Sequence, residues 1–260
     1  MDNTVIISDI NDNLPSRIVF VKFFDAITQI ASKDDCIVTF NNTKVDNKLF
    51  NACLEFYCEN CGFKVMSHSI DNYIFDIDEA NITKADEKLT EFLNGIDNLD
   101  KNPVQIFVAE MIDNIKEHSN AKKGLLYYWC PEGKEVIDIC IADNGISILG
   151  SYIKTNRYLD KIDYSNSDAS AILLANDGYS TKNRPNTENR GYGISRNIKM
   201  ITKGLHGSMY ILSGAALIIC NNNSMRPLSI PEQTEWSGTL VFAEIPLKEP
   251  DDFNFYKYMD

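Results

Sequence analysis

The sequence lacks any apolar run near the roughly 20 residues that a helix needs to span a bilayer. Its longest apolar segments, residues 125–130 and 215–220, have the length of β-strands. The first residues also lack the basic and apolar regions of a secretory signal peptide. These absences predict a soluble cytoplasmic protein without a membrane partner.

Basic residues are few relative to acidic ones. The chain has 25 Lys and Arg against 37 Asp and Glu, which gives a net charge of −12. Anionic phosphate backbones and lipid headgroups would repel such a chain at long range, so direct nucleic-acid binding is not expected. A local basic site is still allowed. The 44% hydrophobic content disfavours disorder, and 260 residues suffice for one large domain or two small ones.

Cysteine pairs with metal-binding spacing are also scarce. Seven cysteines, an odd number spread over the chain, are typical of a reducing compartment in which most of them are small core residues. Cys53, Cys58, Cys61 and His68 could be assembled into a zinc site, but there is only one Cys-x-x-Cys pair. We therefore favour packing for these cysteines over metal binding.

Residues 1–80 predict a small α/β domain. Helices are expected over 17–31 and 48–60, and strands over 36–40, 63–69 and 73–77. Residues 81–102 are polar and acidic with apolar residues at helical spacing, which indicates a linker helix. The small domain faintly resembles the STAS-type regulatory domains that accompany kinase-like ATPases. Extension of the neighbouring sheet and dimerisation are the alternatives.

Residues 103–250 predict a second domain of class α+β. A helix over 103–118 would place its apolar residues on one arc and Glu110, Asn114 and Glu117 on another. Strands are expected over 125–130, 136–142, 208–212, 215–220 and 239–245, and a short helix over 194–203. Because helices and strands do not alternate regularly, we expect a two-layer sandwich of helices on a mixed, mostly antiparallel sheet.

Polar residues in this domain gather in four short segments that occur in a fixed order. They are residues 110–119, 143–147, 177–193 and 237–240. A carboxylate and an amide one helical turn apart can orient a nucleophile and hold Mg²⁺, which prefers oxygen ligands. An aspartate at a strand end can accept a hydrogen bond from an exocyclic amine. Glycines that open a helix would expose backbone N–H groups to an anion. Together these features describe a site for a nucleotide polyphosphate.

The ordered set resembles the boxes of the GHKL ATPases, the Bergerat-fold superfamily that includes gyrase, MutL, sensor histidine kinases and anti-sigma kinases. The resemblance covers about residues 103 to 247. It rests on the segments Glu110-Met-Ile-Asp-Asn114, Asp143-Asn-Gly145, Gly178-Tyr-Ser-Thr-Lys182, Arg190-Gly-Tyr-Gly193 and Ser237-Gly-Thr239. The phosphate loop of other nucleotide-binding proteins is missing, and Gly191-Tyr192-Gly193 does not continue into the dinucleotide fingerprint.

The resemblance implies ATP and Mg²⁺ as ligands and a role for each matching residue. Glu110 would be the general base or would orient water, and Asn114 would coordinate Mg²⁺. Asp143 would bind the adenine amino group, Gly145 would let the base approach the backbone, and Thr239 would support the aspartate. The remaining phosphate contacts would come from His118, Lys182, Gly191, Tyr192 and Gly193.

Two departures from the family pattern matter. Ser147 replaces a glycine of the second box, and a serine tolerates positive φ poorly, so we expect an altered lid hinge. No helix pair carrying a phosphoacceptor histidine is recognisable before the ATP domain, so autophosphorylation on histidine is not expected.

Each signal also has an ordinary structural reading. Glu110 and Asn114 could form a solvated helix face, His118 could simply favour a helix end, and Lys182 could be a loop charge. The ordered set favours an ATPase or phosphotransferase that acts with a protein partner, with a homodimer as one alternative. The rival prediction is a nucleotide-gated interaction switch without turnover. A third prediction is a kinase that phosphorylates a partner's serine, as the anti-sigma kinases do.

Overall fold

The computed structural model describes residues 4–7, 16–32, 37–40, 48–66, 73–97, 99–131, 133–181, 193–222, 224–230 and 234–258. The chain divides into two compact units. Unit 1 comprises residues 1–74 and 230–235, and unit 2 comprises residues 75–229 and 236–260. Among the described helices, none combines the length and the apolar character needed to cross a membrane.

Unit 1 contains a three-stranded parallel sheet of order β1-β2-β3. Its strands are β1 (Thr4–Ile7), β2 (Ile37–Phe40) and β3 (Lys64–Met66), joined through α1 (Ser16–Ala31) and α2 (Lys48–Cys61). Parallel neighbours need such helical crossovers. Phe23 of α1 packs edge-on against Phe50 of α2, and Cys53 and Cys58 are buried in the same helix. The sequence predicted both helices and β2, but β1 was not predicted.

Unit 2 is built on an open seven-stranded sheet of order β4-β5-β6-β10-β7-β8-β9. Every register recorded between β5 and β9 is antiparallel. The strands are β4 (Tyr73–Asp76), β5 (Lys123–Trp129), β6 (Val136–Asp143), β7 (Ser208–Gly214), β8 (Ala216–Asn221), β9 (Ser224–Ser229) and β10 (Trp236–Pro246). With seven α-helices in the described chain, the class is α+β, as the sequence predicted.

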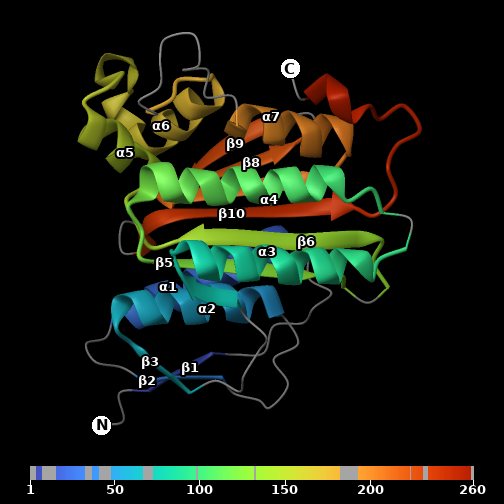
Figure 1. The fold of residues 1–260 in the computed structure, drawn as a ribbon. Coiled ribbons are helices and arrows are strands. Elements are labelled where there is room, and N and C mark those ends of the chain that lie inside the picture. Colours follow the sequence, from blue (N-terminus) through green and yellow to red (C-terminus); the bar gives the residue numbers. More distant parts are fainter. Residues whose placement is uncertain are drawn as a thin grey trace. The chain divides into compact units, whose positions relative to one another are not determined.

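Helices cover one face of this sheet (Figure 1). α3 (Glu79–Asn94), α4 (Asn102–Asn114) and α7 (Gly193–Lys199) lie side by side across it. α5 (Ile148–Thr155) and α6 (Ser167–Asn176) contact each other. Two π-helical turns follow α4 and α7, namely η1 (Ile115–Ser119) and η4 (Met200–Gly204). The single-turn 3₁₀ helices are η2 (Leu159–Lys161), η3 (Tyr164–Asn166) and η6 (Phe255–Tyr258).

The structure corrects the predicted linker over residues 81–102. Its helix, α3, belongs to unit 2, where Ile82, Ala85, Leu89 and Leu93 are buried. The ring of Phe92 lies 4.6 Å from that of Tyr128 on β5. Strand β4, which was assigned to the first domain, is likewise part of the large sheet. Unit 2 therefore begins about 28 residues before the predicted boundary at residue 103.

The helix predicted over residues 103–118 also differs from the structure. α4 begins at Asn102 and ends at Asn114. The π-turn η1 continues the chain to Ser119. Helices α5 and α6 and strand β9 were not predicted.

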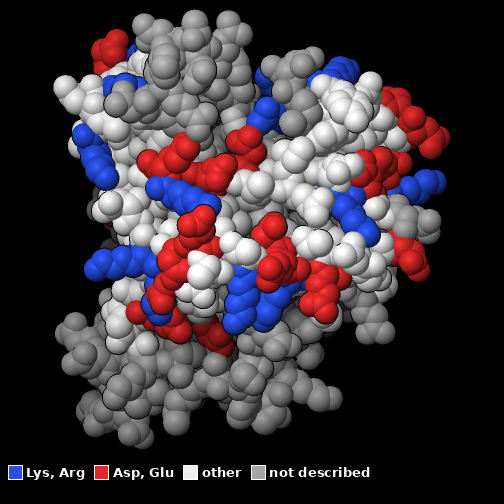
Figure 2. Space-filling model, viewed as in Figure 1, with Lys and Arg blue, Asp and Glu red and all other residues white. Residues whose placement is uncertain are grey.

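Charges on the helical face are mixed in sign (Figure 2). Lys and Arg side chains lie among Asp and Glu side chains over the described part of this face. The net charge of −12 is therefore not gathered there into one acidic surface.

Leu89→Ala tests whether α3 is part of the folded unit. Leu89 is completely buried, so the substitution should lower the free energy of unfolding by about 2–5 kcal/mol, measured by urea denaturation. The exposed neighbour Glu91 provides the control. Glu91→Ala should change the free energy of unfolding by less than about 0.5 kcal/mol. Equal small effects of both substitutions would mean that α3 is a solvated connector.

Candidate functional site

Unit 2 encloses a cavity of about 310 Å³ on the helical side of its sheet. Residues from α4, η1, β6, α5, α7 and β10 line it. Ligand cavities in proteins range over about 300–1,000 Å³, so the volume suits a small molecule or part of one. The lining combines aliphatic side chains such as Ile141, Ile146 and Val241 with a small set of charged and polar groups.

Asp143 is the most deeply buried charged group of the cavity, at 2% exposure. Side chains alternate along a strand, so Asp143 and Ile141 share one face of β6. The backbone N–H of Gly145 donates to Oδ1 over 2.8 Å, and that of Thr239 donates to Oδ2 over 3.2 Å. The side chain of Ser119 is a third partner, and because a carboxylate has about four acceptor positions, one is left for a ligand.

Burial raises the pKa of Asp143 to about 7, although the hydrogen bonds from Gly145 and Thr239 oppose that rise. The carboxyl group is therefore close to half ionised near neutral pH. A ligand that donates a hydrogen bond to it would favour the ionised form and be bound more weakly in acid.

Two glycines allow the backbone to close around Asp143. A Cβ on Gly145 would lie 2.0 Å from the carbonyl oxygen of Ser119, and one on Gly238 would lie 2.1 Å from that of Asp143. Neither contact is sterically tolerable. The N–H of Ile146 donates to the Ser119 carbonyl over 2.6 Å, which joins the turn after β6 to the end of η1.

Thr239 supports Asp143 through its backbone. Its hydroxyl group lies 3.1 Å from the hydroxyl of Ser213 on β7, and Ser213 also donates to the carbonyl of Gly238. The indole N–H of Trp236 donates to the carbonyl oxygen of Asp143 over 3.2 Å. The aspartate is thus held by the start of β10, which lies beside β6 in the sheet.

Glu110 lines the cavity from α4, where it forms an ion pair with Arg196 of α7. The side chains are 28% and 23% exposed, respectively. A Cβ on Gly193 would lie 2.7 Å from Glu110 Oε2, so a glycine lets the two helices approach. The guanidinium engages one oxygen of the Glu110 carboxylate.

Asn114 lies one turn after Glu110 and also lines the cavity. Its Nδ2 is buried and has no hydrogen-bond partner among the described residues. A buried amide without partners costs about 1–3 kcal/mol, so an unused amide at a cavity wall fits a role in ligand binding. The unpartnered Nδ2 is a donor and would suit an anionic oxygen, whereas Mg²⁺ takes oxygen ligands and would have to be held by the other amide atom, Oδ1.

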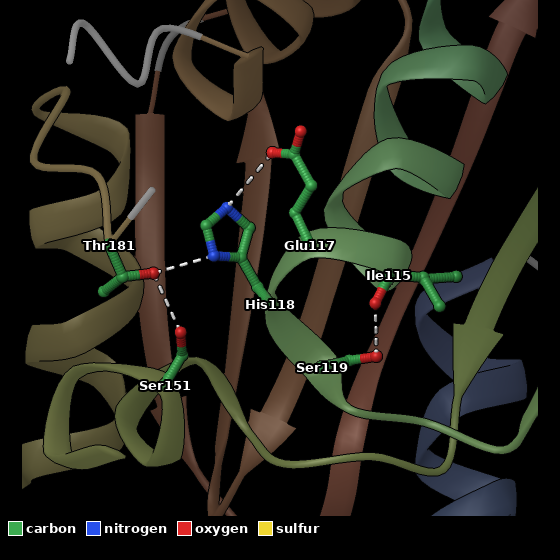
Figure 3. Close-up of polar contacts among 6 residues, drawn as sticks. All are labelled: Ile115, Glu117, His118, Ser119, Ser151 and Thr181. Atoms are coloured by element: carbon green, nitrogen blue, oxygen red, sulfur yellow. Dashed lines mark hydrogen bonds and ion pairs between the residues drawn. The ribbon is translucent and has the colours of Figure 1, made fainter. Parts of the chain in front are cut away.

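His118 and Thr181 meet at the cavity through a chain of polar side chains (Figure 3). His118 Nδ1 lies 2.8 Å from Thr181 Oγ1, which lies 2.8 Å from Ser151 Oγ on α5. His118 is in the π-turn η1, whose wider winding departs from the spacing of a regular helix. Such turns are frequent at functional sites.

The structure corrects the expectation that Ser147 is strained by a positive φ. Ser147 has φ −63° and ψ 168°, an extended conformation that any residue adopts. It is the N-cap of α5, where its hydroxyl accepts a hydrogen bond from the N–H of Gly150 over 3.0 Å. Serine is among the residues preferred at a helix N-cap. This capping role explains why serine occurs here.

The structure gathers Glu110, Asn114, His118, Asp143, Gly193 and Thr239 around one cavity, with Gly145 in the adjoining turn. Lys182, Gly191 and Tyr192 lie outside the described residues, as does Arg190. Sequence reasoning missed Arg196, Ser151 and Thr181. Arg196 could have been found from its place one turn after Gly193, whereas Ser151 carried no distinguishing pattern.

No known family and no curated protein matches this sequence. The site must therefore be interpreted from its own geometry and chemistry.

Gly145→Ala tests the close approach of the turn to η1. The added Cβ would force apart the turn and the Ser119 carbonyl, so we expect a loss of about 1–3 kcal/mol in the free energy of unfolding, measured by urea denaturation. Gly95 has an ordinary φ of −80° and only one neighbour, at 3.3 Å, so Gly95→Ala is the matched control with little expected loss. Similar losses at the two positions would contradict the packing described.

Proposed function

We propose that this protein binds Mg·ATP in the cavity of unit 2 and belongs to the GHKL type with a Bergerat fold. The observation that carries the proposal is Asp143, a buried carboxylate with an unused acceptor position at the wall of a partly apolar cavity. The order of the four sequence segments supports the proposal. Each segment supplies described residues to this one cavity, and the fourth supplies Thr239.

The purine would lie against the aliphatic wall that includes Ile141 and Val241, with its exocyclic amine donating to Asp143. Ile141 and Val241 are paired across β6 and β10, so they form a continuous apolar surface beside the carboxylate. Apolar walls with a few placed polar groups are typical of small-molecule sites. Asp143 would then distinguish adenine from purines that present a carbonyl oxygen at this position.

The polyphosphate would lie toward Asn114, His118 and Arg196. These residues line the cavity from α4, η1 and α7, and they offer an amide, an imidazole and a guanidinium. Mg²⁺, when bound, would neutralise phosphate charge beside the Asn114 amide. Phosphoryl transfer depends mainly on positioning and charge neutralisation, and these residues supply both.

Turnover would follow from a base that acts on the attacking group. Glu110 is the residue proposed to activate the attacking water. The protein would then be an ATPase or phosphotransferase that works with a protein partner. The ion pair of Glu110 with Arg196 specifically favours the second candidate function, a nucleotide-gated switch with little turnover, because the carboxylate already contacts a cation of the protein. A phosphate-release assay beside a binding titration separates the two: binding without product selects the switch.

Asp143→Asn should weaken binding of ATP more than tenfold, measured by calorimetry. The asparagine NH₂ cannot accept hydrogen bonds from the backbone N–H groups that now point at Asp143. In the wild-type protein, affinity for adenosine should fall as the pH drops below about 7, because the neutral acid is a weaker acceptor for the amine than the carboxylate. Adenosine carries no titrating phosphate.

Asp143→Asn is also the control for that pH profile. With no titrating group at this position, its profile for adenosine should be flat. A wild-type affinity that does not change between pH 6 and pH 8 would contradict the contact between Asp143 and the base, since its pKa is raised to about 7.

Glu110→Gln tests turnover. It keeps the size of the side chain and removes its charge, so ATP binding should persist while phosphate release slows by about 10²- to 10⁴-fold. Glu87→Gln changes an exposed glutamate of α3 and should leave the rate unchanged. Wild-type turnover in Glu110→Gln would exclude this residue as the base for water.

A further inference from the structure

Three side chains in the cavity form an arrangement that the roles proposed so far do not use. Thr181 Oγ1 lies 2.8 Å both from His118 Nδ1 and from Ser151 Oγ. On the other side of the imidazole, His118 Nε2 lies 4.0 Å from Glu117 Oε2. Figure 3 shows the ring between the Thr181 hydroxyl and the Glu117 carboxylate. His118, Ser151 and Thr181 all line the cavity.

These groups have the parts of an activated nucleophile. A hydroxyl lies within hydrogen-bond distance of an imidazole, and a carboxylate lies 4.0 Å from the far ring nitrogen, close enough for an ion pair but not for a hydrogen bond. In the reactive tautomer the imidazole proton is on Nε2, and the lone pair of Nδ1 accepts from Thr181. Thr181 has one proton to give, so in this tautomer Ser151 donates to Thr181 Oγ1.

The position of the chain matters as much as its geometry. His118 follows Asn114 by one turn, so a base and a buried amide face the same cavity from neighbouring turns of the chain. The Glu110 carboxylate is engaged by Arg196, whereas His118 Nδ1 faces a hydroxyl group. Of Glu110 and His118, His118 is therefore the one already paired with a hydroxyl group.

We propose that Thr181 accepts the γ-phosphoryl group, so that the protein phosphorylates itself on this threonine. Thr181 Oγ1 bonds to the γ-phosphorus while the bond from that phosphorus to the β–γ bridging oxygen breaks. ADP leaves with the electron pair, and the hydroxyl proton passes to His118 Nδ1. The products are ADP and phosphothreonine. This inference rests on the proposed ATP site and names the acceptor that the site lacked.

The product would change the charge of the cavity. A phosphothreonine carries about −1.5 to −2 charges at neutral pH, and a protonated His118 at its side would hold it in a charge-assisted hydrogen bond. The modification thus leaves a stable anion where the Thr181 hydroxyl now contacts Ser151. Loss of that hydroxyl-to-hydroxyl contact is a local change that a partner protein can detect.

The test incubates the full chain with Mg²⁺ and γ-labelled ATP, and locates the label by peptide mass spectrometry. Wild-type protein should carry phosphothreonine at residue 181. Thr181→Val should carry none, and Thr181→Ser should carry phosphoserine. His118→Gln should slow labelling by about 10²- to 10⁴-fold, the usual contribution of a general base. Thr83→Ala, at an exposed threonine of α3, is the matched control and should label like wild type.

Each of the other outcomes contradicts one part of the proposal. Label that persists in Thr181→Val, or ATP consumed with all phosphate released to solution, overturns the assignment of Thr181 and leaves the ATP site standing. Wild-type labelling in His118→Gln removes the base. A parallel titration with ATP distinguishes these results from a failure of the proposed function. If the chain does not bind ATP at all, both the proposed function and this inference are wrong.

Discussion

The buried carboxylate of Asp143 is the constraint on which the site depends. At 2% exposure, an ionised carboxylate is costly unless hydrogen bonds compensate it, and here two backbone N–H groups from different segments offset part of that cost, while burial still raises the pKa to about 7. To deliver those donors, the chain must bring the turn at Gly145 and the start of β10 against the end of β6. Both approaches need a residue without a Cβ, so Gly145 and Gly238 follow from the aspartate. The local fold around the cavity is therefore largely the structure that a buried acid requires.

The same turn connects the carboxylate to the polar side of the cavity. Ile146 donates to the carbonyl of Ser119, the last residue of η1, so the position of this π-turn is tied to the strand that carries Asp143. The turn in turn places His118 against Thr181. Asp143 and His118 are thus held by one continuous set of backbone contacts. This continuity suits the proposed function, in which one nucleotide contacts both residues.

Much of this could be predicted where local pattern decides structure. The apolar arc of α4, the strand runs of β5, β6 and β10 and the polar turn after Asp143 are all visible in the sequence. The rest depends on tertiary contacts. The π-turn arises where η1 meets the turn after β6, α6 has no clear apolar stripe, and β9 contains Pro227, which argues against a strand. The role of Arg196 could not be predicted, because it depends on the position of α7 beside Glu110.

The most direct measurement of the central claim is a pair of calorimetric titrations of the whole chain with Mg·ATP and Mg·ITP. The two nucleotides differ at purine position 6, an amine in ATP and a carbonyl oxygen in ITP, and at the adjacent N1, which carries a hydrogen only in ITP. The account predicts one ATP site per chain and at least tenfold weaker ITP binding, a difference of about 1.4 kcal/mol, because the oxygen would face the Asp143 carboxylate. Equal affinity for both nucleotides, or no heat from ATP at millimolar concentration, would contradict it.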